Sequence, residues 1–122
     1  MKKEIYILKV HNREFGIPVD KIETITKYPF DEYKKELIYN GRKYKIINLE
    51  EKFYNLPFIK REQYLLLLKN GKGIIYTKSV GIYEKERLSA RCILPMIINK
   101  RIYTGFYSNQ YGIIIEINPE VI

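Results

Sequence analysis

Residues 40–53 constrain the fold most, because a tight turn, a strand and the start of a helix follow one another there without a gap. Asn40 and Gly41 both tolerate a positive φ angle, so this dipeptide predicts the two-residue turn of a β-hairpin. Polar and apolar side chains alternate over residues 42–47, which predicts a half-buried strand. Asn48 then predicts a helix N-cap, because its side chain can accept a hydrogen bond from the first helical turn. A strand that ends in a capped helix indicates a joint between two pieces of sheet.

The composition agrees with a chain built mainly from strands. β-branched and aromatic residues dominate the apolar set, whereas Ala, the strongest helix former, occurs once, as Ala90. With 46% hydrophobic residues, a chain of 122 residues can bury a core of its own and is not expected to be disordered. We therefore expect a mostly β protein in which residues 1–122 form a single domain.

The N-terminal part predicts a hairpin followed by a short helix. Residues 4–10 and 14–18 read as two strands, and Pro18 ends the second because it cannot donate to a ladder. Asp20, with Glu23 three residues later, predicts a capped helical segment. This helix is expected to bury three apolar side chains: Val19, Ile22 and Ile25.

The C-terminal part predicts the centre of the core and further hairpins. Residues 64–68 are apolar on both faces, which is typical of a central strand, and residues 73–80 return after a turn. Gly81 indicates a bend or bulge near the end of the returning strand. Residues 27–36 are predicted to be a surface loop, and residues 84–91 a loop or a helical turn. Residues 93–98 are predicted to be an apolar connector broken by Pro95. A closing hairpin is predicted for 102–107 with 111–117, and a helix start for 118–120.

The side chains that carry most enzyme chemistry are scarce. His11 is the only histidine, and its place in a hairpin turn favours an ordinary surface residue over a general base. Cys92 is the only cysteine, has no histidine nearby in sequence, and is predicted to be a small packed residue. A zinc site would need a Cys/His cluster, and residues 71–73 are explained by a hairpin rather than by a phosphate-binding loop. We therefore expect no enzymatic activity and no cofactor or metal.

No segment predicts a membrane span. A spanning helix needs about 20 consecutive apolar residues, and the longest apolar run here is 64–68. The apolar stretch after the basic residues at the N-terminus is too short for a signal peptide. A single cysteine also excludes an internal disulfide, so these features predict a cytoplasmic protein without membrane insertion.

The formal net charge of +8 suggests a nucleic-acid hypothesis. A basic surface gains affinity for phosphates through counterion release, and tyrosine rings on a small barrel can stack on bases. The candidate residues for such a face are Lys43, Tyr44 and Lys45, then Arg101, Ile102 and Tyr103, and Tyr107. An ordinary solvated surface explains the charge as well, because abundant Lys, Ile, Tyr and Asn indicate base bias in the genome and only six of the 22 basic residues are Arg. Strand alternation with half-buried rings likewise explains the tyrosines.

Five residues of the joint form a longer pattern: Gly41, Ile46, Ile47, Leu49 and Phe53. A turn ending in Gly, a strand and these apolar spacings resemble the CheW-like adaptor family of bacterial chemotaxis. Residues 15–25 resemble the end of the family's first hairpin and the short helix after it, and Gly105 with residues 118–122 resembles its closing segment. Four polar positions differ, since the family has Arg, Pro, Asp and an acidic residue where this sequence has Asn40, Lys45, Asn48 and Thr77.

The resemblance implies a fold and a function. The fold would be two small five-stranded antiparallel barrels, packed together with short connecting helices and joined near residues 48–61. The function would be that of a non-catalytic scaffold that couples receptors to a histidine kinase in chemotaxis-type signal transduction, through barrel edges and the groove between barrels. The candidate partner-binding residues are Tyr39, Asn40, Gly41, Arg42 and Asn48. The sequence thus leaves two hypotheses, a protein-interaction adaptor and a small-barrel nucleic-acid-binding protein.

Overall fold

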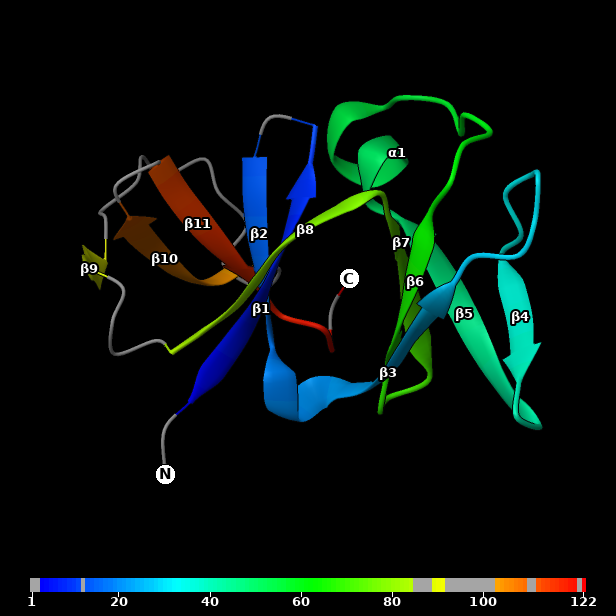
Figure 1. The fold of residues 1–122 in the computed structure, drawn as a ribbon, viewed down its shortest axis with the longest axis horizontal. Helices are drawn as coiled ribbons and strands as arrows, with labels where there is room; N and C mark the ends of the chain where they lie inside the picture. The colour runs from blue at the N-terminus through cyan, green and yellow to red at the C-terminus, as the bar shows by residue number, and fades with distance from the viewer. Residues whose placement is uncertain (1–2, 12, 85–88, 92–102, 110–111, 121) are drawn as a thin grey trace.

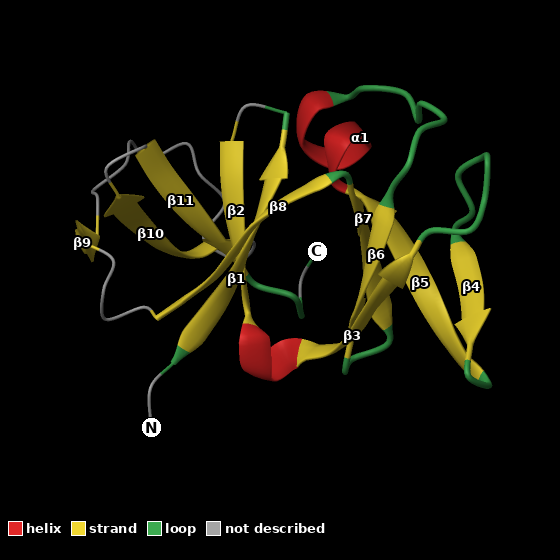
Figure 2. Cartoon of the chain, in the orientation of Figure 1, coloured by secondary structure: helices red, strands yellow, loops and turns green. Residues whose placement is uncertain are grey.

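The computed structural model describes residues 3–11, 13–84, 89–91, 103–109, 112–120 and 122. Strands account for most of these residues, and the helices among them are short (Figure 2). In chain order the elements are β1 (Glu4–Val10), β2 (Arg13–Pro18), the 3₁₀ helix η1 (Val19–Lys21), β3 (Ile22–Lys27), β4 (Glu36–Tyr39), β5 (Arg42–Asn48), α1 (Leu49–Tyr54), β6 (Tyr64–Leu68), β7 (Lys72–Tyr76), β8 (Lys78–Glu84), β9 (Ser89–Arg91), β10 (Tyr103–Asn109) and β11 (Gly112–Ile117). The mostly β class is confirmed. Within the described ranges, no helix has the length and apolar character that crossing a membrane requires.

The strands form two sheets that lie beside each other (Figure 1). One sheet has the order β8-β1-β2-β11-β10-β9, and the other has the order β3-β6-β7-β5-β4. Most neighbours are antiparallel, but β2 pairs with β11 in parallel, and β5 pairs with β7 in parallel. The expected five antiparallel strands per unit therefore become six in the first sheet, with one parallel pair in each sheet. Two parallel neighbours in a sheet are joined by a long crossover connection rather than by a tight turn. Turn signals in the sequence therefore do not reveal which strands pair in parallel.

The first hairpin is present, but a strand largely replaces the helix predicted after it. β1 and β2 pair in antiparallel register. Only Val19–Lys21 form a helical turn, and the chain continues from Ile22 as β3, so the prediction of a helix that buries Ile22 and Ile25 was wrong. β3 pairs with β6, and the side chain of Ile25 is 42% exposed. β-branched residues favour a strand where a partner strand is available, and here β6 provides one.

Residues 73–80 were predicted to be one returning strand, but they are divided between the two sheets at Thr77. β7 ends at Tyr76, and β8 begins at Lys78 as a neighbour of β1 in the first sheet. The predicted bulge is also present, because the β1–β8 register shifts between Ile7 and Leu8. Gly81 has a φ angle of 135°, which only glycine adopts readily, and it lies opposite Ile7 at this shift. The bulge therefore bends an edge strand of the first sheet.

The closing hairpin is confirmed as β10 paired with β11. After it, residues 118–120 form a turn rather than a helix, in which the side-chain Oδ1 of Asn118 accepts a hydrogen bond of 3.0 Å from the Glu120 amide. The predicted connector 93–98 and Cys92 lie outside the described residues.

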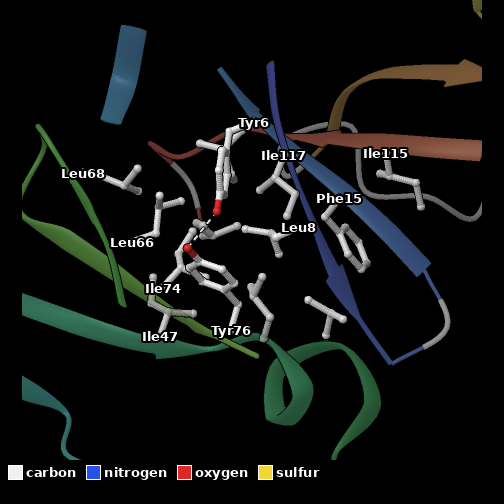
Figure 3. Close-up of a cluster of buried hydrophobic side chains, with 14 residues drawn as sticks. Tyr6, Leu8, Phe15, Ile47, Leu66, Leu68, Ile74, Tyr76, Ile115 and Ile117 are labelled. Atoms are coloured by element: carbon white, nitrogen blue, oxygen red, sulfur yellow. Dashed lines mark hydrogen bonds between the residues drawn. The ribbon is translucent and has the colours of Figure 1, made fainter. Parts of the chain in front are cut away.

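The main core lies between the two sheets, and strands of both contribute to it (Figure 3). Its buried side chains are Tyr6, Leu8, Val10, Phe15, Ile17, Ile47, Leu49, Leu66, Leu68, Ile74, Tyr76, Ile115, Ile117 and Ile122. Figure 3 shows the hydroxyl groups of Tyr6 and Tyr76 directed at each other, with an O···O distance of 2.8 Å. This hydrogen bond joins β1 of one sheet to β7 of the other within an otherwise apolar cluster.

A second core cluster lies on the other face of the second sheet. Its buried members are Tyr28, Tyr44, Ile46, Leu65, Leu67 and Ile75. The loop between β3 and β4 covers it, as the Tyr28 hydroxyl donates to the Glu32 carbonyl at 2.7 Å and the Tyr33 hydroxyl donates to the Ile46 carbonyl at 2.6 Å. The loop predicted at 27–36 is therefore present, and it is held down by tyrosine side chains.

The predicted N-cap of α1 is confirmed, and the helix contacts both sheets. Asn48 accepts a hydrogen bond of 3.2 Å from the Glu50 amide through its side-chain Oδ1. α1 connects β5 and β6 of the second sheet, while its Phe53 ring stacks on Phe15 of β2 with ring centroids 5.1 Å apart. The helix thus lies against the core where the two sheets meet (Figure 1).

Candidate partner-binding surface

Four of the five candidate residues lie together in the turn between β4 and β5. Tyr39 and Arg42 are paired at the ends of the two strands, and Asn40 and Gly41 form the turn with φ angles of 50° and 78°. Both angles are positive, as the predicted two-residue hairpin turn requires. Asn40 therefore adopts a backbone conformation that few residues other than Asn, Asp and Gly accept without strain.

A shallow depression of about 270 Å³ lies beside this turn. Its lining residues come from β3, β4, the turn and β5: Glu23, Thr24, Tyr39, Asn40, Arg42 and Tyr44. β3 and β4 are the two edges of the second sheet, so the sheet curls enough for both edges to line one depression. The Asn40 amide and the Glu23 carboxylate give it hydrogen-bonding groups that a partner could contact.

Arg42 is engaged within the chain. Its Nη2 donates a hydrogen bond to the carbonyl of Lys69 in the β6–β7 turn, and its guanidinium lies 5.2 Å from the centre of the Tyr44 ring. These contacts fix the side chain against the sheet. Arg42 therefore links the β4–β5 turn to the β6–β7 turn of the second sheet.

Asn48 lies away from the other four candidates. It is the last residue of β5, so about six residues at ~3.3 Å each, or roughly 20 Å, separate it from the turn. It is also buried, with 7% of its surface exposed, and its side chain caps α1. Asn48 thus has a local structural role, whereas Asn40, Gly41 and Arg42 are exposed and Tyr39 is half-buried, and their part in partner binding stays a prediction.

Within the residues that the structure describes, the candidates for nucleic-acid binding do not form an exposed aromatic face. Tyr44 is 3% exposed and belongs to the second core cluster, so its ring cannot stack on a base. Lys43 forms an ion pair of 3.0 Å with Glu36. Arg101 and Ile102 lie outside the described residues, and for Tyr103 and Tyr107 only the strand β10 is described.

The structure has two further surface features that were not predicted from the sequence. The edge strands expose large apolar side chains, with Ile38 of β4 72% exposed and Ile82 of β8 54% exposed. A second depression is lined by Lys9, His11, Glu50, Arg61, Thr77 and Lys78. These residues come from separate segments, so only the strand register, and no spacing in the sequence, brings them together. His11 is a turn residue as predicted, with its ring centroid 5.0 Å from that of Tyr54.

Comparisons with known proteins give a likeness of structure only. No family model matches the sequence, and no curated protein does. Among solved structures, the chain is similar to the scaffolding protein TtCheW from Thermoanaerobacter tengcongensis, with a TM-score of 0.76 and 14% sequence identity. The likeness covers 98% of this chain and 86% of that chain. At this identity the likeness shows the fold alone, and the fold is CheW-like.

Proposed function

We propose that this protein is a non-catalytic adaptor of chemotaxis-type signal transduction that holds a receptor and a histidine kinase together in the cytoplasm. The observation that carries the proposal is the similarity, over 98% of the chain, to a structure described as a scaffolding protein. An adaptor needs surfaces rather than a reaction centre, and it needs no cofactor.

The edges of the second sheet supply one such surface. Ile38 of β4 is 72% exposed and Ile25 of β3 is 42% exposed, although both are large apolar residues. An exposed sheet edge can bind a partner through backbone hydrogen bonds, while apolar side chains on the edge strand add affinity. The β4–β5 turn, with Tyr39 and Asn40, lies at the end of this edge.

The residue at position 40 lowers the affinity that we expect for binding through the β4–β5 turn. The resemblance places an arginine at this position in relatives, where a guanidinium can form two hydrogen bonds with a carboxylate. The Asn40 side chain is short and uncharged, and the neighbouring Arg42 is bound to the Lys69 carbonyl. We therefore infer that this adaptor has lost the polar anchor of its relatives, or has moved it elsewhere, and binds the kinase and the receptor weakly through this turn.

Binding measurements with a purified kinase and a receptor fragment of the same organism test the proposal. We expect Ile38→Asp to weaken binding at the β4 edge, because it places a charge in an apolar contact. Ile59→Asp is the matched control, since Ile59 is also an exposed apolar residue, 53% exposed, but lies outside the strands. Asn40→Arg should strengthen binding by about 1 kcal/mol if the surrounding surface is still complementary.

Three results would count against the adaptor or against the β4 edge and the β4–β5 turn as its binding surface. The first is no binding of either protein together with binding of single-stranded DNA that weakens steeply with salt, which would favour the nucleic-acid alternative. The second is tight binding that is indifferent to Ile38→Asp and to changes at Asn40, which would place the contact elsewhere. The third is an equal loss with Ile38→Asp and with Ile59→Asp, which would make the loss nonspecific.

A further inference from the structure

The end of β1 and the start of β8 form a depression at the junction of the two sheets. The chain crosses from β7 to β8 at Thr77, so the depression lies where the sheets are connected. Its volume is about 320 Å³. Its side chains come from β1, the β1–β2 turn, α1, the segment before β6 and the β7–β8 crossing: Lys9, His11, Glu50, Arg61, Thr77 and Lys78. We call these six residues the junction pocket.

Two like charges face each other along one wall of the junction pocket. Lys9 and Lys78 are directly opposite in the antiparallel register of β1 and β8. Like charges at directly opposed positions repel each other and destabilise a sheet. In the described part of the chain, neither lysine forms an ion pair. A bound anion would relieve this repulsion.

The other charges of the junction pocket offset each other. Arg61 forms an ion pair with Glu50, whose side chain is only 17% exposed. Glu14 of β2 is opposite Lys9 on the other side of β1, but it lies outside the pocket lining and forms no ion pair with Lys9 within the described residues, so the net positive charge of the lining comes from Lys9 and Lys78. A concave site concentrates such a charge more than a flat surface does, because the protein walls have a low dielectric constant.

The chemistry of the walls favours a carboxylate over a nucleic acid. Single-stranded nucleic acids bind where exposed rings stack on bases along a basic groove. The ring among the six residues, that of His11, already lies against Tyr54 with centroids 5.0 Å apart, and Glu50 would repel a run of phosphates. A single carboxylate can instead accept charge-assisted hydrogen bonds from the two lysines.

We propose that the junction pocket binds a Glu or Asp side chain in an acidic segment of a protein partner. The proposal rests on the proposed adaptor function and adds the chemistry that one partner must offer. The pocket includes Glu50 of α1, which follows β5, whereas the Tyr39–Arg42 turn precedes β5. The two surfaces lie at opposite ends of that strand, so two partners can be held at once.

A labelled oligoglutamate peptide is a direct probe of this pocket. Fluorescence anisotropy at about 50 mM salt keeps electrostatic contacts measurable, because the Debye length there exceeds ~10 Å. The variant with both Lys9→Gln and Lys78→Gln should bind the peptide at least about tenfold more weakly than the natural protein. Backbone NMR should show the largest shifts at Lys9, Thr77 and Lys78 during the titration.

The matched control carries Lys21→Gln and Lys45→Gln, which lower the net charge equally at exposed positions outside both depressions. It should change peptide affinity by no more than about twofold, since distant surface charges are screened. Equal losses in the two double variants would overturn the proposal, because binding would then follow net charge alone.

An oligothymidylate titration separates the carboxylate from a phosphate ligand. If the Lys9 and Lys78 substitutions weaken oligothymidylate as much as oligoglutamate, the proposal of a carboxylate site is refuted. Failure of the adaptor function gives a different pattern, in which kinase and receptor fail to bind while the natural protein still binds oligoglutamate through Lys9 and Lys78.

Discussion

The hydrogen bond between Tyr6 and Tyr76 makes a sharp test of how the two sheets are held together. The hydroxyl oxygens are 2.8 Å apart, the rings meet edge to face at 6.0 Å, and the two residues are 8% and 5% exposed. Their surroundings are apolar side chains of both sheets (Figure 3). Each hydroxyl is therefore the partner that the other needs in order to be buried.

Removing one hydroxyl should cost more than removing both. Tyr76→Phe leaves the Tyr6 hydroxyl buried without its partner, and Tyr6→Phe does the same to Tyr76. Leaving one buried polar group unsatisfied costs about 1–3 kcal/mol, whereas replacing both partners by apolar groups of the same shape is nearly neutral. We expect each single variant to lose about 1–3 kcal/mol of unfolding free energy and the double variant to lose less than the sum of the two.

Urea denaturation of the natural protein, the two single variants and the double variant measures this coupling. The slope of the free energy against urea concentration should stay constant, because the surface exposed on unfolding does not change. If the two losses add within about 0.5 kcal/mol, the hydroxyl groups act independently, and the reasoning is refuted. Phe keeps the aromatic ring in every variant, so the packing of the two rings is unchanged and the comparison measures the hydroxyl groups alone.

Three further predictions concern the core and its response to pH. Burial, and then the hydrogen bond with Tyr6, raises the pKa of Tyr76 above the ordinary 10.0, so the stability that it contributes is complete below pH 10 and lost as the unfolded chain ionises above it. The unfolding free energy should fall there by at most about 1.4 kcal/mol per pH unit for this group, and less steeply in Tyr76→Phe; equal slopes would contradict this. Leu66→Ala, at a site with 0% exposure, should cost about 2–5 kcal/mol in urea denaturation, and a loss under about 0.5 kcal/mol would mean that β6 is not central. Gly16→Ala should lower the melting temperature, because an added Cβ would lie 2.1 Å from Ile5 Cδ1, and Ile5→Val in the same chain should recover part of the loss since Val lacks that atom.

Signals that depend on neighbouring residues predicted the structure well. The Asn40-Gly41 turn, the Asn48 cap and the apolar strand 64–68 were all found where the sequence placed them. The turn and the cap depend on backbone conformation or on hydrogen bonds within a few residues, and the strand 64–68 shows as a run of apolar residues because it is buried on both faces. The described part of the chain therefore keeps its local preferences in the folded state.

Features that depend on pairing between distant strands could not be predicted from the sequence in the same way. Residues 22–25 have spacings compatible with a helix, but the available edge of β6 makes them a strand. Gly81 indicates in the sequence that a bend or bulge is near, yet nothing in the sequence tells that the chain leaves the second sheet for the first at Thr77. The opposition of Lys9 and Lys78 follows only from that crossing, so the junction pocket could not be predicted from spacing.

Burial separates two positions that keep the pattern, Ile46 and Leu49, from two that depart from it, Asn40 and Lys45, whereas Asn48 departs although it is buried, because its side chain caps α1. Ile46 and Leu49, which match, are 2% and 0% exposed, and a core position requires apolar volume in any sequence with this fold. Asn40 and Lys45, which depart, are both exposed, and surface substitutions usually change stability by no more than about 0.5 kcal/mol. The fold therefore constrains Ile46 and Leu49 through core volume, and it constrains Asn40 through the positive φ angle of the turn. Under the proposed adaptor function, a partner that contacts this turn would meet the short amide of Asn40 rather than the arginine that the resemblance implies, so the partner residue opposite Asn40 is the first place to look for a compensating change.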